Sequence, residues 1–421
     1  MVGATALAML LASGLAVQAS LEVIAEVRVH GNHVTSDEDV VKLTGIALGA
    51  PFTATTIREV TSKLKAANKF DEVSVLKRFA SIEDASKIVL VIVVNEGAVR
   101  IEVPKDKDAP VTVVRRRGLR NLMFMPIFDA EDGYGVTAGV RLAYVGVAGK
   151  RSRLSFPLTL GGTKRAGMEL ERLFQKGPFT RVEVGSALQL STNPAYDVED
   201  GRKRLWAKAE RAMGPWRLNV NTGAQWVGFG GVDDSFRSVG GAVAFDTRLD
   251  PMLPRNAVFA SAAVDQLFFG SGSGSGRPEI TRTRLDVRGY LGLMRQSVFV
   301  VRIVRDGADG PLPPYLRPIL GGWSTLRGFK AGSFTGDTMV TGSAELRVPL
   351  NSPVSFAKVG VSAFFDAGSA YDYGQRFRDQ PIYKGIGGSG WATMGPLRLA
   401  LSVAHGLGAT TRVNFGGGLS F

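Results

Sequence analysis

The sequence predicts a small α+β domain followed by an all-β transmembrane barrel of antiparallel strands, with sixteen as the expected strand number. Residues 21–97 carry helix-sized and strand-sized apolar patterns in the order β-α-α-β-β. From about residue 120 to 421, apolar residues alternate with polar or small ones in segments of about ten, the length with which a tilted strand crosses a bilayer. Glycine supplies 52 of 421 residues, which indicates closely packed or sharply curved sheet.

Composition excludes several classes of site. The formal net charge of +13 would suit nucleic acid or an anionic membrane surface. The basic residues are interleaved with apolar ones and form no helix face, so we expect no nucleic-acid partner. The chain has no cysteine, and His30, His33 and His405 lack metal-ligand spacing. We therefore expect no metal and no cofactor.

Residues 1–20 are expected to be a signal peptide. An apolar run over residues 6–16 precedes Val17-Gln18-Ala19, a small-x-small ending typical of a secretory cleavage site. A basic n-region is missing, so the alternative is a buried N-terminal helix. The longest other apolar run, residues 88–94, is far below the ~18 residues of a membrane helix. Any membrane span must then be a β-barrel.

Residues 21–97 divide into five elements. The first strand alternates over residues 23–29 and ends at the turn signal Gly31-Asn32. Two helices follow, with capping-box patterns beginning at Ser36 and at Thr56, and Asn68 ends the second. Residues 70–76 and 87–95 are the remaining strands.

Residues 98–118 are expected to be a linker. Its centre, residues 104–110, is charged and bounded by Pro104 and Pro110. The triplet Arg115-Arg116-Arg117 follows. Such a triplet either forms a solvated face or, at a membrane boundary, lies against lipid phosphates.

Residues 119–421 are expected to form the barrel. In a soluble sandwich the apolar face would line a core, but some fifteen short segments joined mostly by tight turns, with no helix between them, favour a lipid-facing apolar side and a polar lumen. We count ten strands before the loop at 320–330, starting near Tyr134, and five after it. Single-chain bacterial barrels have an even number, so a sixteenth strand is expected at residues 119–128. The Ser-Gly run 270–276 is a loop between strands.

Two groups of motifs carry a family resemblance. Val-x-Val-x-Gly-Asn after the first strand and Asn-Lys-Phe-Asp-Glu-Val after the second helix resemble a POTRA (polypeptide-transport-associated) domain. The barrel half resembles the BamA/TamA-type superfamily of outer-membrane assembly and translocation proteins, of the bacterial surface antigen type. Its matching stretches are Phe245-Asp246-Thr247-Arg248 with Pro251 and Pro254, Gly321-Gly322 with Leu326-Arg327-Gly328-Phe329, Ala344-Glu345-Leu346-Arg347-Val348-Pro349-Leu350, Phe364-Phe365-Asp366-Ala367-Gly368, and the terminal Phe421.

The resemblance implies a bacterial outer-membrane protein with its POTRA domain in the periplasm. It implies unfolded polypeptide clients, outer-membrane lipids and periplasmic accessory proteins as partners. The chain departs from the family in having one POTRA domain, where the essential assembly protein has several. Two-partner secretion transporters carry two POTRA domains after a plug helix, for which we expect no room here.

The resemblance also implies site residues. The loop at 320–330 folds back into the lumen, where Arg327, followed by Gly328 and Phe329, is expected to meet Asp366 or Glu345. By alternation, Glu345 shares a strand face with Arg347, and Asp366 shares one with Phe364, so both acids should point inward. Asp246, Thr247 and Arg248 form the family strand-and-turn motif, and Phe421 is the C-terminal strand signal.

The leading hypothesis is a protein that inserts or translocates other polypeptides without ATP, with the POTRA domain as client receptor and a weak seam between the first and last strands. Gly416, Gly417 and Gly418 either weaken that seam or only relieve crowding at closure. The alternatives are a two-partner-secretion-like export pore and a passive structural barrel. We expect no enzyme, because Gly385-x-Gly387-x-x-Gly390 lacks the flanking βαβ unit of a dinucleotide site.

Overall fold

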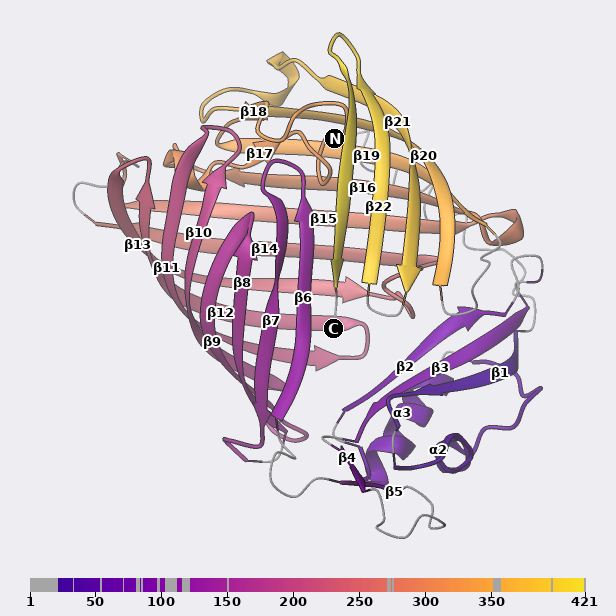
Figure 1. The fold of residues 1–421 in the computed structure, drawn as a ribbon. Coiled ribbons are helices and arrows are strands. Elements are labelled where there is room, and N and C mark those ends of the chain that lie inside the picture. Colours follow the sequence, from indigo (N-terminus) through magenta and orange to yellow (C-terminus); the bar gives the residue numbers. More distant parts are fainter. Residues whose placement is uncertain are drawn as a thin grey trace. The chain divides into compact units, whose positions relative to one another are not determined.

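The computed structural model describes residues 22–32, 34–53, 55–70, 72–80, 84, 86–96, 99–102, 112–115, 122–149, 151–270, 274, 276–350, 357–394 and 397–419. The chain forms two compact units, one at the N-terminus and one a barrel, and each is described by itself (Figure 1). The expected signal peptide, the segment 104–110, Arg116, Arg117 and Phe421 lie outside the described residues.

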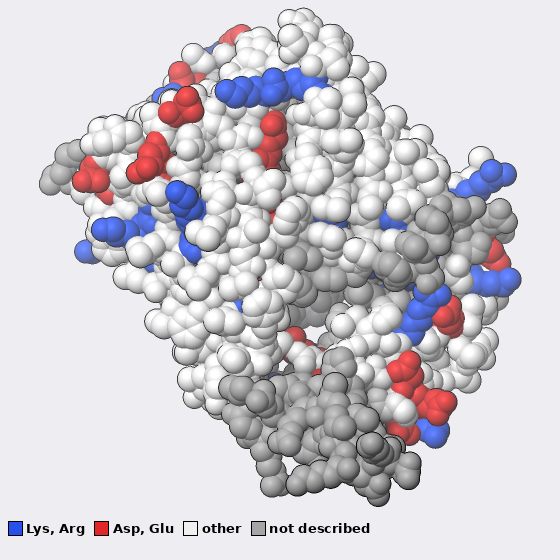
Figure 2. All heavy atoms as spheres, viewed as in Figure 1, with Lys and Arg blue, Asp and Glu red and all other residues white. Residues whose placement is uncertain are grey.

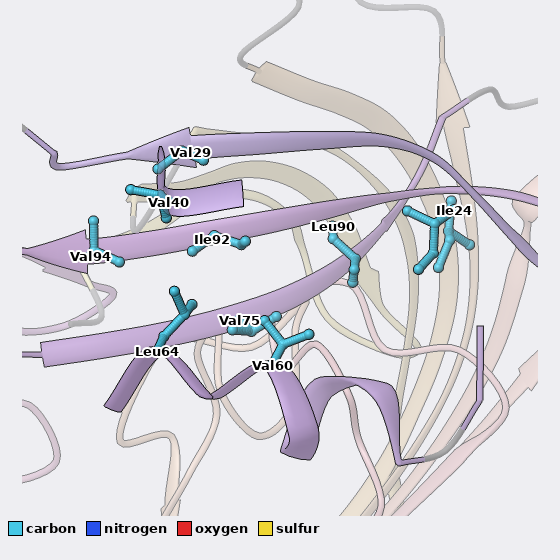
Figure 3. Close-up of a cluster of buried hydrophobic side chains, with 10 residues drawn as sticks. Ile24, Val29, Val40, Val60, Leu64, Val75, Leu90, Ile92 and Val94 are labelled. Atoms are coloured by element: carbon cyan, nitrogen blue, oxygen red, sulfur yellow. The ribbon is translucent and has the colours of Figure 1, made fainter. Parts of the chain in front are cut away.

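The N-terminal unit is a three-stranded sheet with two helices. The sheet order is β1-β3-β2, with β1 (Val23–His30) parallel to β3 (Lys87–Asn95) and β2 (Glu72–Phe79) antiparallel to β3. Helices α2 (Asp37–Thr44) and α3 (Thr56–Ala66) connect β1 to β2. The predicted β-α-α-β-β order is confirmed. Figure 3 shows the core between helices and sheet, built from Ile24, Val29, Val40, Val60, Leu64, Val75, Ile88, Leu90, Ile92 and Val94.

Local signals explain most of these boundaries. Ser36 caps α2, since its Oγ accepts the N–H of Asp39 at 3.2 Å. The predicted cap at Thr56 is wrong: Thr56 is the first helical residue of α3, the N-cap is Thr55, and no side chain caps this end. The Thr56 hydroxyl instead accepts the N–H of Thr53, so it is used in the preceding turn. Gly31 has φ 84°, and a Cβ there would lie 2.0 Å from the Val94 carbonyl oxygen, so the turn requires glycine.

The second unit is a closed antiparallel barrel in which each strand pairs with the next along the chain and the last pairs with the first. The predicted sixteen strands are confirmed. In order they are β6 (Leu122–Glu131), β7 (Gly135–Val145), β8 (Ser152–Gly161), β9 (Thr163–Leu173), β10 (Arg181–Asn193), β11 (Val198–Met213), β12 (Trp216–Phe229), β13 (Val232–Asp246), β14 (Ala257–Phe269), β15 (Glu279–Gly292), β16 (Val298–Ala308), β19 (Thr338–Leu350), β20 (Ala357–Tyr371), β21 (Tyr383–Met394), β22 (Leu397–Gly406) and β23 (Thr411–Leu419). The strand expected at 119–128 corresponds to β6, and residues 119–121 lie outside the described residues.

The barrel wall is apolar outside and polar inside. Leu160, Phe124 and Val413 are 73, 65 and 65% exposed, whereas their strand neighbours facing the other way include charged and hydroxyl side chains. On the face drawn in Figure 2, most of the barrel surface carries no charged side chain. This inversion of the usual soluble pattern is what a lipid-facing wall requires. Within the described residues, no helix has the length and apolar character needed to cross a membrane.

Shorter elements complete the described chain. Two strands within the predicted linker, β4 (Val99–Glu102) and β5 (Thr112–Arg115), pair antiparallel. The connection from β16 to β19 contains the 3-10 turn η2 (Pro314–Leu316) and the paired strands β17 (Ile319–Leu320) and β18 (Phe334–Thr335). Two more 3-10 turns are η1 (Met294–Gln296) and η3 (Phe377–Asp379).

The connection between β16 and β19 packs on the inner wall. Its Leu312, Tyr315 and Leu316 join an apolar cluster with inward residues of the long strands β12 to β15. Those partners are Val227, Phe236, Leu267, Phe269 and Ile280. The connection therefore shares a small apolar core with strands β12 to β15. This core fixes the chain just before the loop at 320–330.

Candidate functional site

The loop at 320–330 is a compact turn structure rather than an open strap. Gly321, Gly322 and Gly328 have φ of 115°, 81° and 99°, values that favour glycine. The Gly322 N–H donates to the Phe329 carbonyl at 2.9 Å, and the Gly321 N–H donates to the Thr325 hydroxyl at 3.0 Å. These contacts close the loop on itself and present the side chain of Arg327 to the barrel wall.

Arg327 is held by Asp366 in a two-pronged ion pair. Its Nε donates to Asp366 Oδ2 and its Nη2 to Asp366 Oδ1, both at 2.8 Å. The Arg327 backbone N–H also donates to Oδ2, at 3.1 Å. Arg327 is 7% exposed and Asp366 1% exposed. Two parallel charge-assisted bonds in a site shielded from water fix both position and orientation of the loop.

A second carboxylate and a hydroxyl complete the guanidinium contacts. Arg327 Nη1 donates to Glu345 Oε2 at 3.1 Å, and Nη2 donates to Ser343 Oγ at 3.1 Å. The guanidinium carbon lies 3.3 Å from the centre of the Phe364 ring. The sequence left Asp366 and Glu345 as alternatives, and the structure brings both to Arg327. The sequence pattern did not predict the contacts of Ser343 and Phe364 with Arg327, although alternation places these two residues on the same strand faces as the acids.

Glycines on the inner wall let the loop backbone approach closely. A Cβ on Gly385 would lie 2.1 Å from the Arg327 carbonyl oxygen, and one on Gly328 would lie 2.6 Å from the Gly406 nitrogen. A Cβ on Gly416 would lie 2.7 Å from the Trp323 indole. Strands β21, β22 and β23 thus each place a glycine directly beneath the loop, namely Gly385, Gly406 and Gly416. We call these three residues the glycine floor. Gly385 belongs to the segment that matched a dinucleotide fingerprint only in letters.

Apolar side chains anchor both ends of the loop. Leu320 and Leu326 are fully buried, and they form one apolar cluster with Phe329 and Met339. Phe334, from β18, stacks on Tyr383 with ring centres 3.6 Å apart. Phe329, which the resemblance singled out, therefore acts in this structure as a core residue beside the ion pair.

The predicted motif Asp246-Thr247-Arg248 lies elsewhere. Arg248 Nε and Nη2 each donate to an Asp246 oxygen at 2.9 Å, and Arg248 lies over the Phe259 ring at 4.4 Å. Thr247 Oγ1 accepts the Val258 N–H at 2.8 Å and so ties the start of the turn to β14. Strands β14, β15 and β16 separate this motif from β19, so the structure does not bring it to the loop at 320–330.

The barrel closes through a short seam between β23 and β6. Within the described residues these strands share two register pairs, Gly417 with Ala130 and Gly418 with Asp129. The adjoining pairings are much longer, with nine register pairs between β22 and β23 and ten between β6 and β7. Among the described residues the pairing across this seam is therefore shorter than either adjoining pairing, and residues 420 and 421 lie outside that description. Figure 1 shows β6 beside the last strands of the chain.

Comparisons with known proteins follow the same division of the chain. Residues 160–421 match the family model described as the Omp85 superfamily domain, and residues 22–97 match the POTRA model described as surface antigen variable number repeat. No curated protein sequence matches the chain. Among solved structures, BamA from Haemophilus ducreyi lacking POTRA domains 1-3 is similar with a TM-score of 0.60 and 12% identity, over 94% of this chain and 84% of that one. CdiB from Escherichia coli is similar with a TM-score of 0.52 and 12% identity, over 96% and 92%.

Proposed function

The chain belongs to the Omp85 superfamily, and on this premise we propose that it inserts other polypeptides into the bacterial outer membrane through the seam between β6 and β23. The POTRA domain lies in the periplasm and serves as the client receptor. No covalent bond is made or broken in this process, so the function needs no catalytic residue.

The short seam is the observation that carries the proposal. Within the described residues two register pairs join β23 to β6, whereas every other neighbouring pair in the barrel shares at least six. Strand edges with unpaired N–H and C=O groups template the addition of another strand. A client strand that pairs with β6 would exchange few existing hydrogen bonds for many new ones, and the incoming chain would then lie in the barrel wall facing lipid.

The POTRA sheet suits an earlier step in the same way. Strands β1 and β2 are the two outer strands of the three-stranded sheet, because β3 lies between them. Residues 49–52 already bond to the start of β1, so within the described residues β2 offers the longer open edge. An extended client can add to such an edge by main-chain hydrogen bonds, which are indifferent to sequence. The receptor would thus accept many clients while they are still unfolded.

Export through the lumen is the competing function. The loop at 320–330 is clamped inside the barrel by Arg327, and residues Leu312, Tyr315 and Leu316 pack against the inner wall. Passage of a polypeptide through the lumen would have to displace both groups of contacts. Insertion through the seam requires neither, which is why we favour it over an export pore or a passive pore.

A disulfide across the seam tests the proposal. The chain has no cysteine, so a pair introduced at Gly418 and Asp129, which face each other in register, would be unique. A Cβ at Gly418 meets nothing closer than 3.7 Å, so the substitution is tolerated sterically. The control pair replaces Leu401 and Phe415, which face each other across β22 and β23.

The measurement is folding of a urea-unfolded eight-stranded outer-membrane barrel supplied to proteoliposomes of the variant. We expect the oxidised seam pair to stop client insertion and reductant to restore it, while the control pair stays active. Insertion that continues through an oxidised seam would refute the proposed route. Release of a secreted client into the vesicle lumen with the seam locked would favour export instead.

A further inference from the structure

Three cations stand on the outer face of the barrel wall. Lys164 lies on β9, Lys203 on β11 and Arg237 on β13, and all three side chains are exposed. By alternation they share the outward face of their strands with apolar residues that are about half exposed, namely Met168, Leu205 and Val239. None of the three cations forms an ion pair or a side-chain hydrogen bond with a described residue. Each therefore projects from the apolar wall without a partner in that part of the protein.

The cations on β9 and β11 mark one end of the uncharged wall. The outward positions that follow Lys164 carry no charge until Arg172, and those that follow Lys203 carry none until Arg211. Each interval is eight residues, or about 26 Å along the strand, which is comparable with the ~25 Å apolar band of outer-membrane barrels. These four cations therefore stand at the two boundaries of the lipid-facing band.

Carboxylates lie on the outward face only beyond this boundary. Glu199 on β11 and Asp233 on β13 are exposed, and each lies four residues from the cation of its strand on the side away from the apolar band. From apolar band to strand end, the outward face thus reads uncharged, cationic and then acidic. The cations occupy the level at which the wall changes from lipid-facing to polar.

The three cations lie at one height of the wall. In register, Lys203 is two residues farther along its strand than the position that pairs through β10 with Lys164. Arg237 is likewise two residues farther than the position that pairs through β12 with Lys203. An offset of one residue per strand, ~3.3 Å along against ~4.8 Å across, corresponds to a tilt of about 35°, within the range of outer-membrane barrels. The neighbouring cations are then about 12 Å apart along a level line.

Trp226 on β12 identifies the same level independently of charge. It lies opposite Lys203 in register and is the diagonal neighbour of Arg237. Its side chain is 46% exposed on the outer face. Tryptophan is enriched at membrane–water interfaces, because one end of its ring system is apolar and the other is polar. Its place between two cations is what a lipid headgroup level requires.

The level belongs to the outer leaflet of the outer membrane. The POTRA domain lies in the periplasm and precedes β6, so β6 starts at the periplasmic end of the barrel. Strands β9, β11 and β13 are the fourth, sixth and eighth in the barrel and therefore start at the extracellular end. Lys164, Lys203 and Arg237 lie near these starts.

We propose that Lys164, Lys203 and Arg237 bind the phosphate groups of anionic lipids in the outer leaflet, with Trp226 seated between the headgroups. Lysine and arginine donate charge-assisted hydrogen bonds to phosphate oxygens. Position selects a lipid as the source of the phosphate, because the cations project from the wall that faces lipid and not into the lumen. The inference concerns how the barrel is held in the membrane and does not depend on the route that clients take.

Quenching of Trp226 fluorescence by brominated lipid tests the site. The purified full chain is reconstituted in vesicles of phosphatidylcholine and phosphatidylglycerol, with bromine on the acyl chains of one lipid or the other. The chain has five tryptophans, so the Trp226 signal is taken as the difference between each protein and its Trp226→Phe counterpart. We expect phosphatidylglycerol to be enriched about fivefold or more at Trp226, the effect of one cation at a membrane surface.

Removal of the cations beside Trp226 should abolish this enrichment. In the Lys203→Gln, Arg237→Gln variant we expect the two brominated lipids to quench equally, whereas Lys203→Arg should retain the preference. The matched control is Arg172→Gln, Arg211→Gln, which removes two outward cations from the opposite boundary and should leave the enrichment at Trp226 unchanged. Unaltered gel mobility of unboiled samples verifies that each variant folds.

Three outcomes would overturn the inference. The first is equal quenching by the two lipids in the wild type, and the second is unchanged enrichment in the Lys203→Gln, Arg237→Gln variant. The third is an equal loss of enrichment in the control variant, which would show a general effect of net charge. Displacement of the lipid by inorganic phosphate, where sodium chloride of the same ionic strength displaces none, would assign the site to free phosphate and contradict the lipid as its ligand.

Discussion

Arg327 is the residue in which the loop and the barrel wall meet, and it is almost fully shielded from water. Its two carboxylate partners belong to different strands, Asp366 to β20 and Glu345 to β19. Isolated burial of any of these charges would be costly, but mutual pairing and three further hydrogen bonds offset that cost. Removal of one member leaves the remaining charges buried without their partner.

A double-mutant cycle measures this coupling. We expect Arg327→Ala and Asp366→Ala each to lower barrel stability by about 3 kcal/mol, the scale for breaking a buried pair. The double variant should be no worse than the worse single variant, and Arg327→Lys should rescue poorly because lysine lacks the planar fork. The unfolding temperature gives the coupling.

Arg378 and Asp379 supply the control cycle. Their side chains are 72 and 61% exposed, so substitutions there should change stability by no more than the ~1 kcal/mol of a surface pair. Strictly additive effects of the Arg327 and Asp366 substitutions would show that these residues do not act as one unit.

The glycine floor gives a second prediction at this scale. Gly385→Ala would put a Cβ 2.1 Å from the Arg327 carbonyl, so the loop backbone must move. We expect a loss of about 1–3 kcal/mol, as for other overpacked sites, and faster protease cleavage in the loop. Gly390→Ala lies on the same strand with nothing within 4 Å and should have no such effect. Equal protease resistance of the two variants would contradict the close approach.

At the scale of elements, the N-terminal sheet has a core separate from the barrel. Its ten buried apolar residues all come from β1, α2, α3, β2 and β3. Independent cores allow one part to fold without the other. The receptor role can therefore be removed without removal of the barrel.

Deletion of residues 21–97 should leave an inserted barrel that no longer supports client assembly. The physical reason is that the deletion takes away the sheet edge proposed to bind clients and leaves every described barrel strand pairing intact. Client levels in cell envelopes are the measurement, and the full-length chain expressed at the same level is the control. Normal client levels in the deletion strain would rule out the receptor role.

At the scale of the whole molecule, closure of the barrel governs resistance to unfolding. All sixteen strands have two neighbours, so no full edge is left from which unfolding can start, and the shortest pairing among the described residues is the seam between β23 and β6. Barrel unfolding should therefore need heat as well as detergent.

The expected result is heat-modifiable mobility: unboiled protein should run faster than boiled protein on a detergent gel, because the closed barrel stays compact. The oxidised Gly418→Cys, Asp129→Cys variant should need a higher temperature before the slower-running, unfolded form appears on the gel. Equal mobility of boiled and unboiled samples, or recovery of the protein in the soluble periplasmic fraction, would contradict the barrel in the membrane.

The sequence by itself determined what depends on local periodicity. The alternation in the C-terminal 300 or so residues specified the lipid-facing and lumenal faces, and the need for an even strand number located β6 before any pairing was known. The inward direction of Glu345 and Asp366 followed from the same period. The N-terminal β-α-α-β-β order followed from caps and helical spacing.

Only the tertiary structure decided which inward side chains meet. Alternation places Ser343 and Phe364 in strands, but it does not predict their contact with Arg327. That contact depends on how a loop folds across two strands, and no local pattern encodes this. The sequence suggested only seam roles for Gly416, Gly417 and Gly418, and the structure shows that glycines of β21 to β23 lie against the loop. The length of the described seam depends on the register around the whole barrel, which is set by all sixteen pairings together. These are long-range properties, and the two-residue period of a strand carries no information about them.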